Sequence, residues 1–110
     1  IGKGMMLTNF DRTLAPNRAL IRRIKDTANT LHKPLQLDMF NGGGTDGGEA
    51  HKSRDGKPTA VSCLPVRYGH CAYSIAHLQD IADAIDIFTE LIVNFDEAAY
   101  RASINFLKGV

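Results

Sequence analysis

Apolar runs and amphipathic stretches alternate along the first part of the chain. Residues 4–11 are apolar enough for a buried strand, and residues 35–40 form a second such run. Between them, residues 17–32 repeat apolar positions at helical spacing, while charged and polar side chains occupy the other face. The apolar positions of this predicted helix are Leu20, Ile21, Ile24, Ala28 and Leu31. The pattern therefore predicts a strand, a helix and a second strand.

The second part of the chain continues this alternation. Residues 59–64 predict a third strand, and residues 65–73 predict a loop. A long amphipathic helix follows, and residues 96–108 predict one more helix. The apolar positions that mark the long helix are Leu78, Ile81, Ala82, Ile85, Phe88 and Ile92. Strands that alternate with helices predict an α/β fold in which helices cover a mixed, largely parallel sheet.

A glycine-rich stretch, residues 41–48, joins the second predicted strand to a short helix. The spacing of Asp46 and Glu49 resembles a capping box, so this helix should begin near Asp46. The glycines match the spacing of a dinucleotide fingerprint, but no acidic residue follows about 20 positions later to hold a ribose. A tight turn is the simplest structural explanation. Consecutive glycines exceed what a turn needs, so the stretch favours close approach of the backbone to a ligand.

His70 lies in the second predicted loop, directly after Arg67, Tyr68 and Gly69. A single loop histidine is more often a surface or structural residue than a ligand. However, loops that follow neighbouring parallel strands open at one edge of a sheet, where α/β proteins bind their ligands. We therefore expect His70 and the glycine stretch to meet at one rim, where the imidazole could bind a metal ion or transfer a proton.

Length and composition narrow the class of protein. The chain has 110 residues, and its 13 Lys and Arg against 12 Asp and Glu leave a formal net charge of +1, so we expect no nucleic-acid partner. No apolar run approaches the ~20 residues of a membrane helix, so we expect no membrane partner. Two cysteines favour a reduced, cytoplasmic setting over a disulfide scaffold. At this length we expect residues 1–110 to form a single, partial α/β domain.

Four motifs, taken in order, resemble a known family. They are Asp11-Arg12-Thr13-Leu14, Gly43-Gly44-Thr45-Asp46-Gly47-Gly48, Gly56-x-Pro58-Thr59 and Arg67-Tyr68-Gly69-His70. Over residues 1–91 their order and spacing resemble the C-terminal part of the tetrahedral (TET) aminopeptidases of the glutamyl aminopeptidase family. The resemblance implies the C-terminal portion of a zinc-peptidase-like three-layer domain, without the family's inserted β domain, and assembly into a homo-oligomer. Residues 94–110 would form an extra C-terminal helix.

The same resemblance implies a site with two divalent ions, zinc or cobalt, that removes N-terminal residues from peptides. His70 matches the family's final metal-binding histidine, and Arg67 and Tyr68 would support it without touching the metal. The residues that match the loop on the substrate side of the metals are Gly43, Gly44, Thr45 and Asp46. The family's other histidine, bridging aspartate, catalytic glutamate and further carboxylates lie upstream of the matched segment. We therefore assign no catalytic residue, and expect the chain alone to bind metal weakly and to be inactive.

Two functions stay open at this point. The first is a C-terminal fragment of a dinuclear-metal aminopeptidase that acts on peptides. The second is a non-catalytic small α/β module that uses its exposed sheet edge for binding or assembly. A glycosidase, which labels given to some family members suggest, is disfavoured. Sugar hydrolysis needs two facing carboxylates, whereas this chain has no Trp and only Asp46 and Glu49 near the loops.

Overall fold

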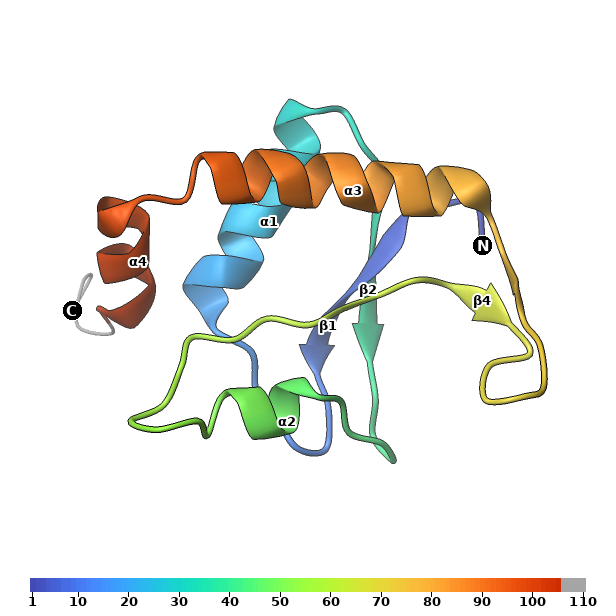
Figure 1. The fold of residues 1–110 in the computed structure, drawn as a ribbon, viewed down its shortest axis with the longest axis horizontal. Coiled ribbons are helices and arrows are strands. Elements are labelled where there is room, and N and C mark those ends of the chain that lie inside the picture. The colour runs from blue at the N-terminus through green and yellow to red at the C-terminus, as the bar shows by residue number, and fades with distance from the viewer. Residues whose placement is uncertain (106–110) are drawn as a thin grey trace.

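The computed structural model describes residues 1–105 and alternates strands with helices (Figure 1). The strands are β1 (Met5–Phe10), β2 (Leu35–Met39), β3 (Ser62–Cys63), β4 (Val66–Arg67) and β5 (Ile75–Ala76). The helices are α1 (Arg18–Thr30), α2 (Gly47–Ala50), α3 (Leu78–Val93) and α4 (Glu97–Ile104). The predicted α/β class and its first two strands and two long helices are confirmed. No helix within residues 1–105 is long and apolar enough to cross a membrane.

The main sheet is mixed and has the strand order β2-β1-β3. Strand β1 pairs with β2 in parallel and with β3 in antiparallel orientation. The expected third strand over residues 59–64 is reduced to two residues. One reason is that the carbonyl of Thr59 accepts a hydrogen bond from Asn17 N, 2.8 Å away at the start of α1, so this end of the segment is directed to the helix. The carbonyl of Val61 still accepts from Thr8 N at 2.9 Å, which keeps the segment beside β1.

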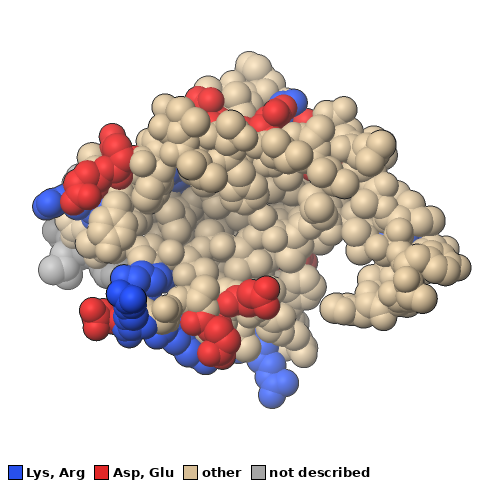
Figure 2. All heavy atoms as spheres, viewed as in Figure 1, with Lys and Arg blue, Asp and Glu red and all other residues tan. Residues whose placement is uncertain are grey.

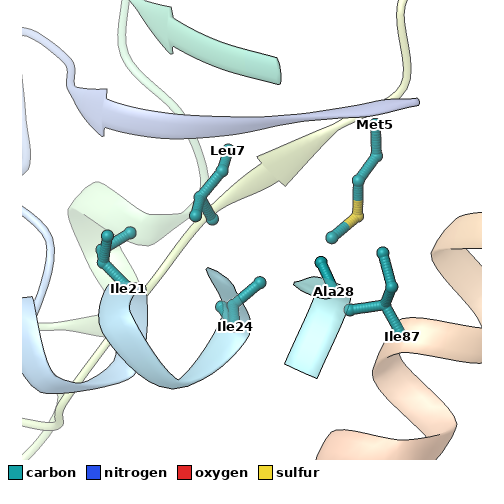
Figure 3. Close-up of a cluster of buried hydrophobic side chains, with 6 residues drawn as sticks. All are labelled: Met5, Leu7, Ile21, Ile24, Ala28 and Ile87. Carbon is teal, nitrogen blue, oxygen red and sulfur yellow. The ribbon is translucent and has the colours of Figure 1, made fainter. Parts of the chain in front are cut away.

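The hydrophobic core lies between β1 and two helices, α1 and α3 (Figure 3). Its fully buried members are Met5, Leu7, Ile21, Ile24, Ala28 and Ile87. The residues from α1 are three and four positions apart, which is the spacing of one helix face. Asn17 caps this helix by accepting a hydrogen bond from Leu20 N at 3.0 Å. The predicted apolar face of α1 is therefore the face that packs on the sheet.

Helix α3 does not follow its apolar pattern in this way. Leu78, Ile85 and Ile92 are 81%, 60% and 69% exposed, whereas Asp80 and Asp83 are buried. These two carboxylates are held by specific partners. Asp80 accepts from the backbone N–H groups of Gly2 and Gly4 at 2.7 and 2.8 Å, and Asp83 accepts from Lys33 Nζ at 2.9 Å.

The pKa values of both carboxyls reflect these bonds. Desolvation raises the pKa of Asp80, but the two backbone hydrogen bonds, together with the nearby charges of His77 and the N-terminus, hold the pKa below its ordinary value. The hydrogen bond from Lys33, assisted by Gln79, lowers the pKa of Asp83. The inner face of α3 is thus fixed by hydrogen-bonded anions as well as by apolar packing.

Two further expectations need correction. The segment expected to be a loop over residues 65–73 begins with β4, which pairs with β5 in an antiparallel two-stranded hairpin. The last helix begins one residue after Asp96, whose side chain caps it by accepting from Ala99 N at 2.8 Å, but it ends at Ile104 rather than at residue 108. Residues 106–108 of the predicted helix lie outside the described residues.

Candidate functional site

The glycine loop, residues 41–48, and His70 border one hollow of about 640 Å³. Its wall consists of Phe40, Gly43, Gly44, Thr45, Asp46, Gly47, Ala50, Thr59, Ala60, Val61, Ser62, Cys63 and His70. The route by which His70 arrives differs from the one expected. Strand β3 is antiparallel to β1, so its end does not open at the same edge as the end of β2. The connection within the β4–β5 hairpin, which contains His70, brings the histidine to the hollow instead.

Three glycines of the loop approach protein atoms closely. A Cβ on Gly47 would lie 2.4 Å from Val61 Cγ2 and 2.6 Å from a methyl of Leu14. A Cβ on Gly48 would lie 2.2 Å from Thr13 Oγ1, and one on Gly44 would lie 2.7 Å from Thr13 Cγ2. Side chains at these positions would push the loop away from the turn that follows β1. These glycines therefore allow tight packing between the two loops.

Gly42 and Gly43 have a different environment. A Cβ at either position would meet no atom within 4 Å, so both residues face open space. Gly43 also borders the hollow, and its carbonyl accepts a hydrogen bond from Arg12 N at 3.0 Å. The part of the loop that a ligand could approach is therefore its first half, while its second half is fixed against the protein.

Asp11 links the two loops. One carboxylate oxygen accepts from Thr13 N at 2.6 Å and Thr13 Oγ1 at 2.7 Å, and the other accepts from Thr45 Oγ1 at 2.6 Å. The side chain is almost completely buried. The hydrogen bond from Thr45, followed by those from Thr13, lowers the pKa of Asp11 against the opposing effect of desolvation. An ionised Asp11 therefore holds Thr45 in place at the rim of the hollow.

Asp46 does not cap helix α2, contrary to the prediction from its spacing to Glu49. Its backbone is already helical, with φ −58° and ψ −23°, whereas a capping residue is extended so that its side chain can reach back. Its side chain accepts no capping hydrogen bond. The carbonyl of Thr45 accepts from Gly48 N at 3.0 Å, and Glu49 pairs with Lys52 at 3.4 Å. The exposed carboxylate of Asp46 therefore stays available at the hollow.

The hairpin presents His70 from an unusual backbone. Tyr68 and His70 have φ of +61° and +58°, the left-handed region that non-glycine residues seldom adopt. Both residues are exposed. No side-chain hydrogen bond or ion pair joins Arg67 or Tyr68 to another residue within 1–105, and neither borders the hollow. The expected support of His70 by these two side chains is therefore not visible in the described part of the chain.

The residues present provide only part of a metal site. Within residues 1–105, no three His, Cys, Asp or Glu side chains lie close enough together to hold one ion. His70 is exposed and borders a hollow, so its imidazole can serve as one ligand among several. A catalytic zinc ion commonly uses about three protein ligands. The described residues thus fit the role of one contributor to a metal centre.

Sequence reasoning assigned no role to Asp11 and Thr13, which the structure places at the base of the glycine loop. A signal was present in the sequence. An aspartate followed two residues later by a threonine is typical of an Asx turn, in which the side chain accepts from the backbone two positions on. The partner of Asp11 in the glycine loop, Thr45, could not be recognised from a local pattern because it lies 34 residues away in sequence.

Comparisons with known proteins bear on the family and the fold. The family description "M42 glutamyl aminopeptidase" matches residues 1–87. FrvX of Escherichia coli (strain K12) is 37% identical over 70 residues, which are 64% of this chain and 20% of FrvX. The TET aminopeptidase from the marine sediment archaeon Thaumarchaeota archaeon SCGC AB-539-E09 matches with a TM-score of 0.91 at 35% identity. The match covers 94% of this chain and 29% of that one.

A third relative has the same fold. PhTET1-12s matches with a TM-score of 0.71 and 25% identity, over 84% of this chain and 27% of that one. The chain thus spans less than a third of the length of these relatives. The family match extends over most of the 110 residues and includes the glycine loop and His70. This chain belongs to the M42 glutamyl aminopeptidase family.

Proposed function

We propose that this chain is the C-terminal part of a dinuclear-metal aminopeptidase and contributes one metal ligand and the substrate-side loop to its active site. His70 would bind one of two divalent ions, zinc or cobalt, and Gly43, Gly44, Thr45 and Asp46 would line the path of the peptide. The observation that carries the proposal is that His70 and this loop border the same hollow. The metals would polarise the scissile carbonyl and activate a water molecule when bound.

The chain's own residues have defined tasks in this proposal. The buried, ionised Asp11 holds Thr45 at the rim, so the loop presents a fixed edge to a peptide. Gly42 and Gly43 leave space beside that edge, which lets a peptide backbone come close. The carboxylate of Asp46 provides a negative charge that could pair with a substrate's α-amino group. Arg67 and Tyr68, which precede His70 in the hairpin, would support the histidine without touching the metal.

The remaining metal ligands and the general base would come from outside this chain, so the chain alone should not hydrolyse peptides. The relative PhTET1-12s is described as a dodecamer, which supports assembly of the complete protein into a homo-oligomer. We place this protein in the cytoplasm, without a nucleic-acid or membrane partner. Residues 1–110 would form one partial catalytic domain, with α4 as an addition at its end.

Metal titration tests the role of His70 directly. Zinc or cobalt is titrated into the chain, and binding is followed by calorimetry and by the visible absorption of cobalt. We expect weak binding that falls at least tenfold in His70→Asn. The matched control is His32→Asn, because His32 is also exposed and has a φ of +53°, and Asn tolerates this backbone. Equal losses in both variants would contradict a specific role for His70.

Activity provides the second test. The matched segment of the Thaumarchaeota TET aminopeptidase is replaced by residues 1–87 of this chain, and release of amino acids from aminoacyl-nitroanilides is measured. We expect metal-dependent activity that His70→Asn abolishes, and a raised KM in Thr45→Val. The 110-residue chain by itself should release no amino acid. Zinc-dependent release by the isolated chain, lost in His70→Asn, would show that our account of the missing ligands is wrong.

A non-catalytic binding module remains the second candidate. It is favoured by one observation, that β2 forms an edge of the three-stranded sheet, with Leu37 and Met39 57% and 61% exposed. The two candidates differ in the chimaeric enzyme. A chimaera that folds and assembles but has no activity with any metal would favour the binding module over the aminopeptidase.

A further inference from the structure

An uncharged stripe follows the outer face of α3 along its full length. The stripe consists of Leu78, Ala82, Ile85, Thr89 and Ile92, all of which are exposed. Their spacings alternate between four and three residues, which is the heptad spacing of helices that pack along one another. The inner face of the helix is already occupied, because Asp80, Asp83 and Ile87 are buried against the rest of the molecule. The stripe is therefore a second packing face of α3.

The stripe exposes large apolar side chains to water, which is energetically unfavourable. The three large apolar side chains of the stripe are more exposed than buried. They form a row about 14 residues long, which is roughly 21 Å at 1.5 Å per residue. Figure 2 shows a largely uncharged surface along α3, with acidic side chains gathered at its upper edge. Large exposed apolar side chains aligned on one helix face are typical of an interaction site, unlike singly scattered exposed residues.

Charge beside the stripe indicates the chemistry of the partner. Helix α3 contains four acidic residues and no Lys or Arg. Asp86 and Glu90 are exposed beside the stripe. The carboxylate of Asp86 lies 3.0 Å from Lys33 Nζ. The carboxylate of Glu90 accepts a hydrogen bond from the side-chain amide of Asn94 at 2.8 Å and pairs with no Lys or Arg among residues 1–105. A partner helix with an apolar seam and flanking Lys or Arg would complement this face. A second copy of α3 would bring acidic side chains next to each other.

The comparisons indicate where such a helix would come from. The archaeal TET aminopeptidase superposes on 94% of this chain, yet more than two thirds of that protein lies outside the match. A face that is buried by another part of a complete subunit would be exposed when its C-terminal segment is viewed alone. We infer that the outer stripe of α3 docks an amphipathic helix with basic flanks, supplied by the part of an M42 subunit outside this segment. This inference depends on family membership and not on the metal or substrate roles proposed above.

Co-expression tests the inference with a defined probe. The tagged 110-residue chain is produced together with the untagged part of the Thaumarchaeota TET aminopeptidase that lies outside the match. We expect the two to co-purify as a one-to-one complex, with its mass measured by light scattering. Ile85→Asp, at the centre of the stripe, should weaken the complex at least tenfold. The complex should also weaken as salt is raised, because oppositely charged flanks are screened.

The matched control is Ile104→Asp, which places the same charge on an exposed isoleucine of α4. It should bind like the original chain, and circular dichroism should show equal helix content in both variants. His70→Asn should also bind normally, which separates this inference from the proposed metal role. Failure of the original chain to capture the probe, or equal capture by both Asp variants, would overturn the inference. So would a stripe-dependent dimer of the chain alone, because it would identify a second copy as the occupant.

Discussion

The two loops that border the hollow are built in opposite ways. The glycine loop is clamped against the turn after β1. Thr45 donates a hydrogen bond to the buried carboxylate of Asp11, which also accepts two from Thr13, and three of the loop's glycines leave no room for a side chain. The hairpin that carries His70 consists of two strands of two residues each, with exposed side chains and two left-handed residues. The wall formed by the glycine loop is fixed by contacts within this chain, whereas the wall formed by the hairpin projects from it.

This difference indicates which parts of a site a segment can hold by itself. A two-stranded hairpin alone is marginally stable in water. Left-handed backbone at non-glycine residues is retained where surrounding structure enforces it. The glycine loop has such surroundings within this chain, but the hairpin has few. The hairpin is therefore the region that we expect to depend on the rest of an M42 subunit for its final shape.

The strongest way to break the clamped loop is to add a methyl group where it has no room. In Gly47→Ala the new Cβ would lie 2.4 Å from Val61 and 2.6 Å from Leu14, so side chains must move. Overpacking of this kind costs about 1–3 kcal/mol. Urea unfolding should show this loss. The matched control is Gly42→Ala, whose Cβ meets no atom within 4 Å and which should stay within about 0.5 kcal/mol of the original chain. Equal losses would contradict the clamp.

Elements with a strong period were predictable from the sequence. The first strand, the first helix and the second strand were found within two residues of their observed ends. Helix α3 was also found, but not the orientation of its faces. Hydrophobic periodicity assumes that apolar residues face the core. It could not reveal that Asp80 and Asp83 are turned inward by bonds to Gly2, Gly4 and Lys33, because these partners lie about 50 or more residues away in sequence.

The site was predictable in part. That His70 and the glycine loop face one hollow was expected, although for the wrong reason, since β3 is antiparallel to β1. Strand direction depends on pairing between distant segments and leaves no local pattern in so short a strand. At Gly47 and Gly48, the structure gives a reason for glycine other than a ligand. Glycine reports close approach of the backbone to something, but only the structure shows that Thr13 and Leu14, rather than a ligand, are the neighbours of Gly47 and Gly48.

Acid should weaken the clamp in a predictable direction. The pKa of Asp11 is lower in the folded chain than its ordinary value near 3.8, so the ionised carboxylate favours the folded state. This contribution is complete above the unfolded pKa and is lost as pH falls through the lowered folded pKa. Asp11→Asn should therefore unfold at lower urea than the original chain at pH 7, and the difference should shrink as pH falls from about 4 towards 2.

The control for this pH series is Asp46→Asn. The Asp46 carboxylate is exposed and accepts no capping hydrogen bond. At each pH in the series, Asp46→Asn should therefore have nearly the same urea midpoint as the original chain. A constant difference between Asp11→Asn and the original chain at every pH would show that Asp11 acts through its shape and not through its charge. That result would contradict a stabilising role for the Asp11 charge, but it would not affect the close packing of the glycines.

The smallest change in stability is expected in the hairpin that carries His70. Tyr68 has a φ of +61°, which costs an L-residue about 1 kcal/mol, so Tyr68→Gly relieves strain. Glycine also adds a comparable freedom to the unfolded chain, so the free energy of unfolding should change by less than about 0.5 kcal/mol. Arg67 lies in β4, next to Tyr68, and has no such strain to relieve. In Arg67→Gly the free energy of local opening, measured by hydrogen exchange of the hairpin amides, should therefore fall by about 1 kcal/mol.

The difference between these two glycine variants isolates the strain at Tyr68 from the general cost of glycine. If both variants speed exchange of the hairpin amides equally, the left-handed residue is not strained, and the hairpin holds His70 without help. If Tyr68→Gly leaves exchange unchanged but weakens metal binding, the Tyr68 side chain helps to direct the imidazole, because glycine also adopts the left-handed backbone. In that case a side chain of the hairpin fixes the His70 wall of the hollow, as Asp11 fixes the glycine loop.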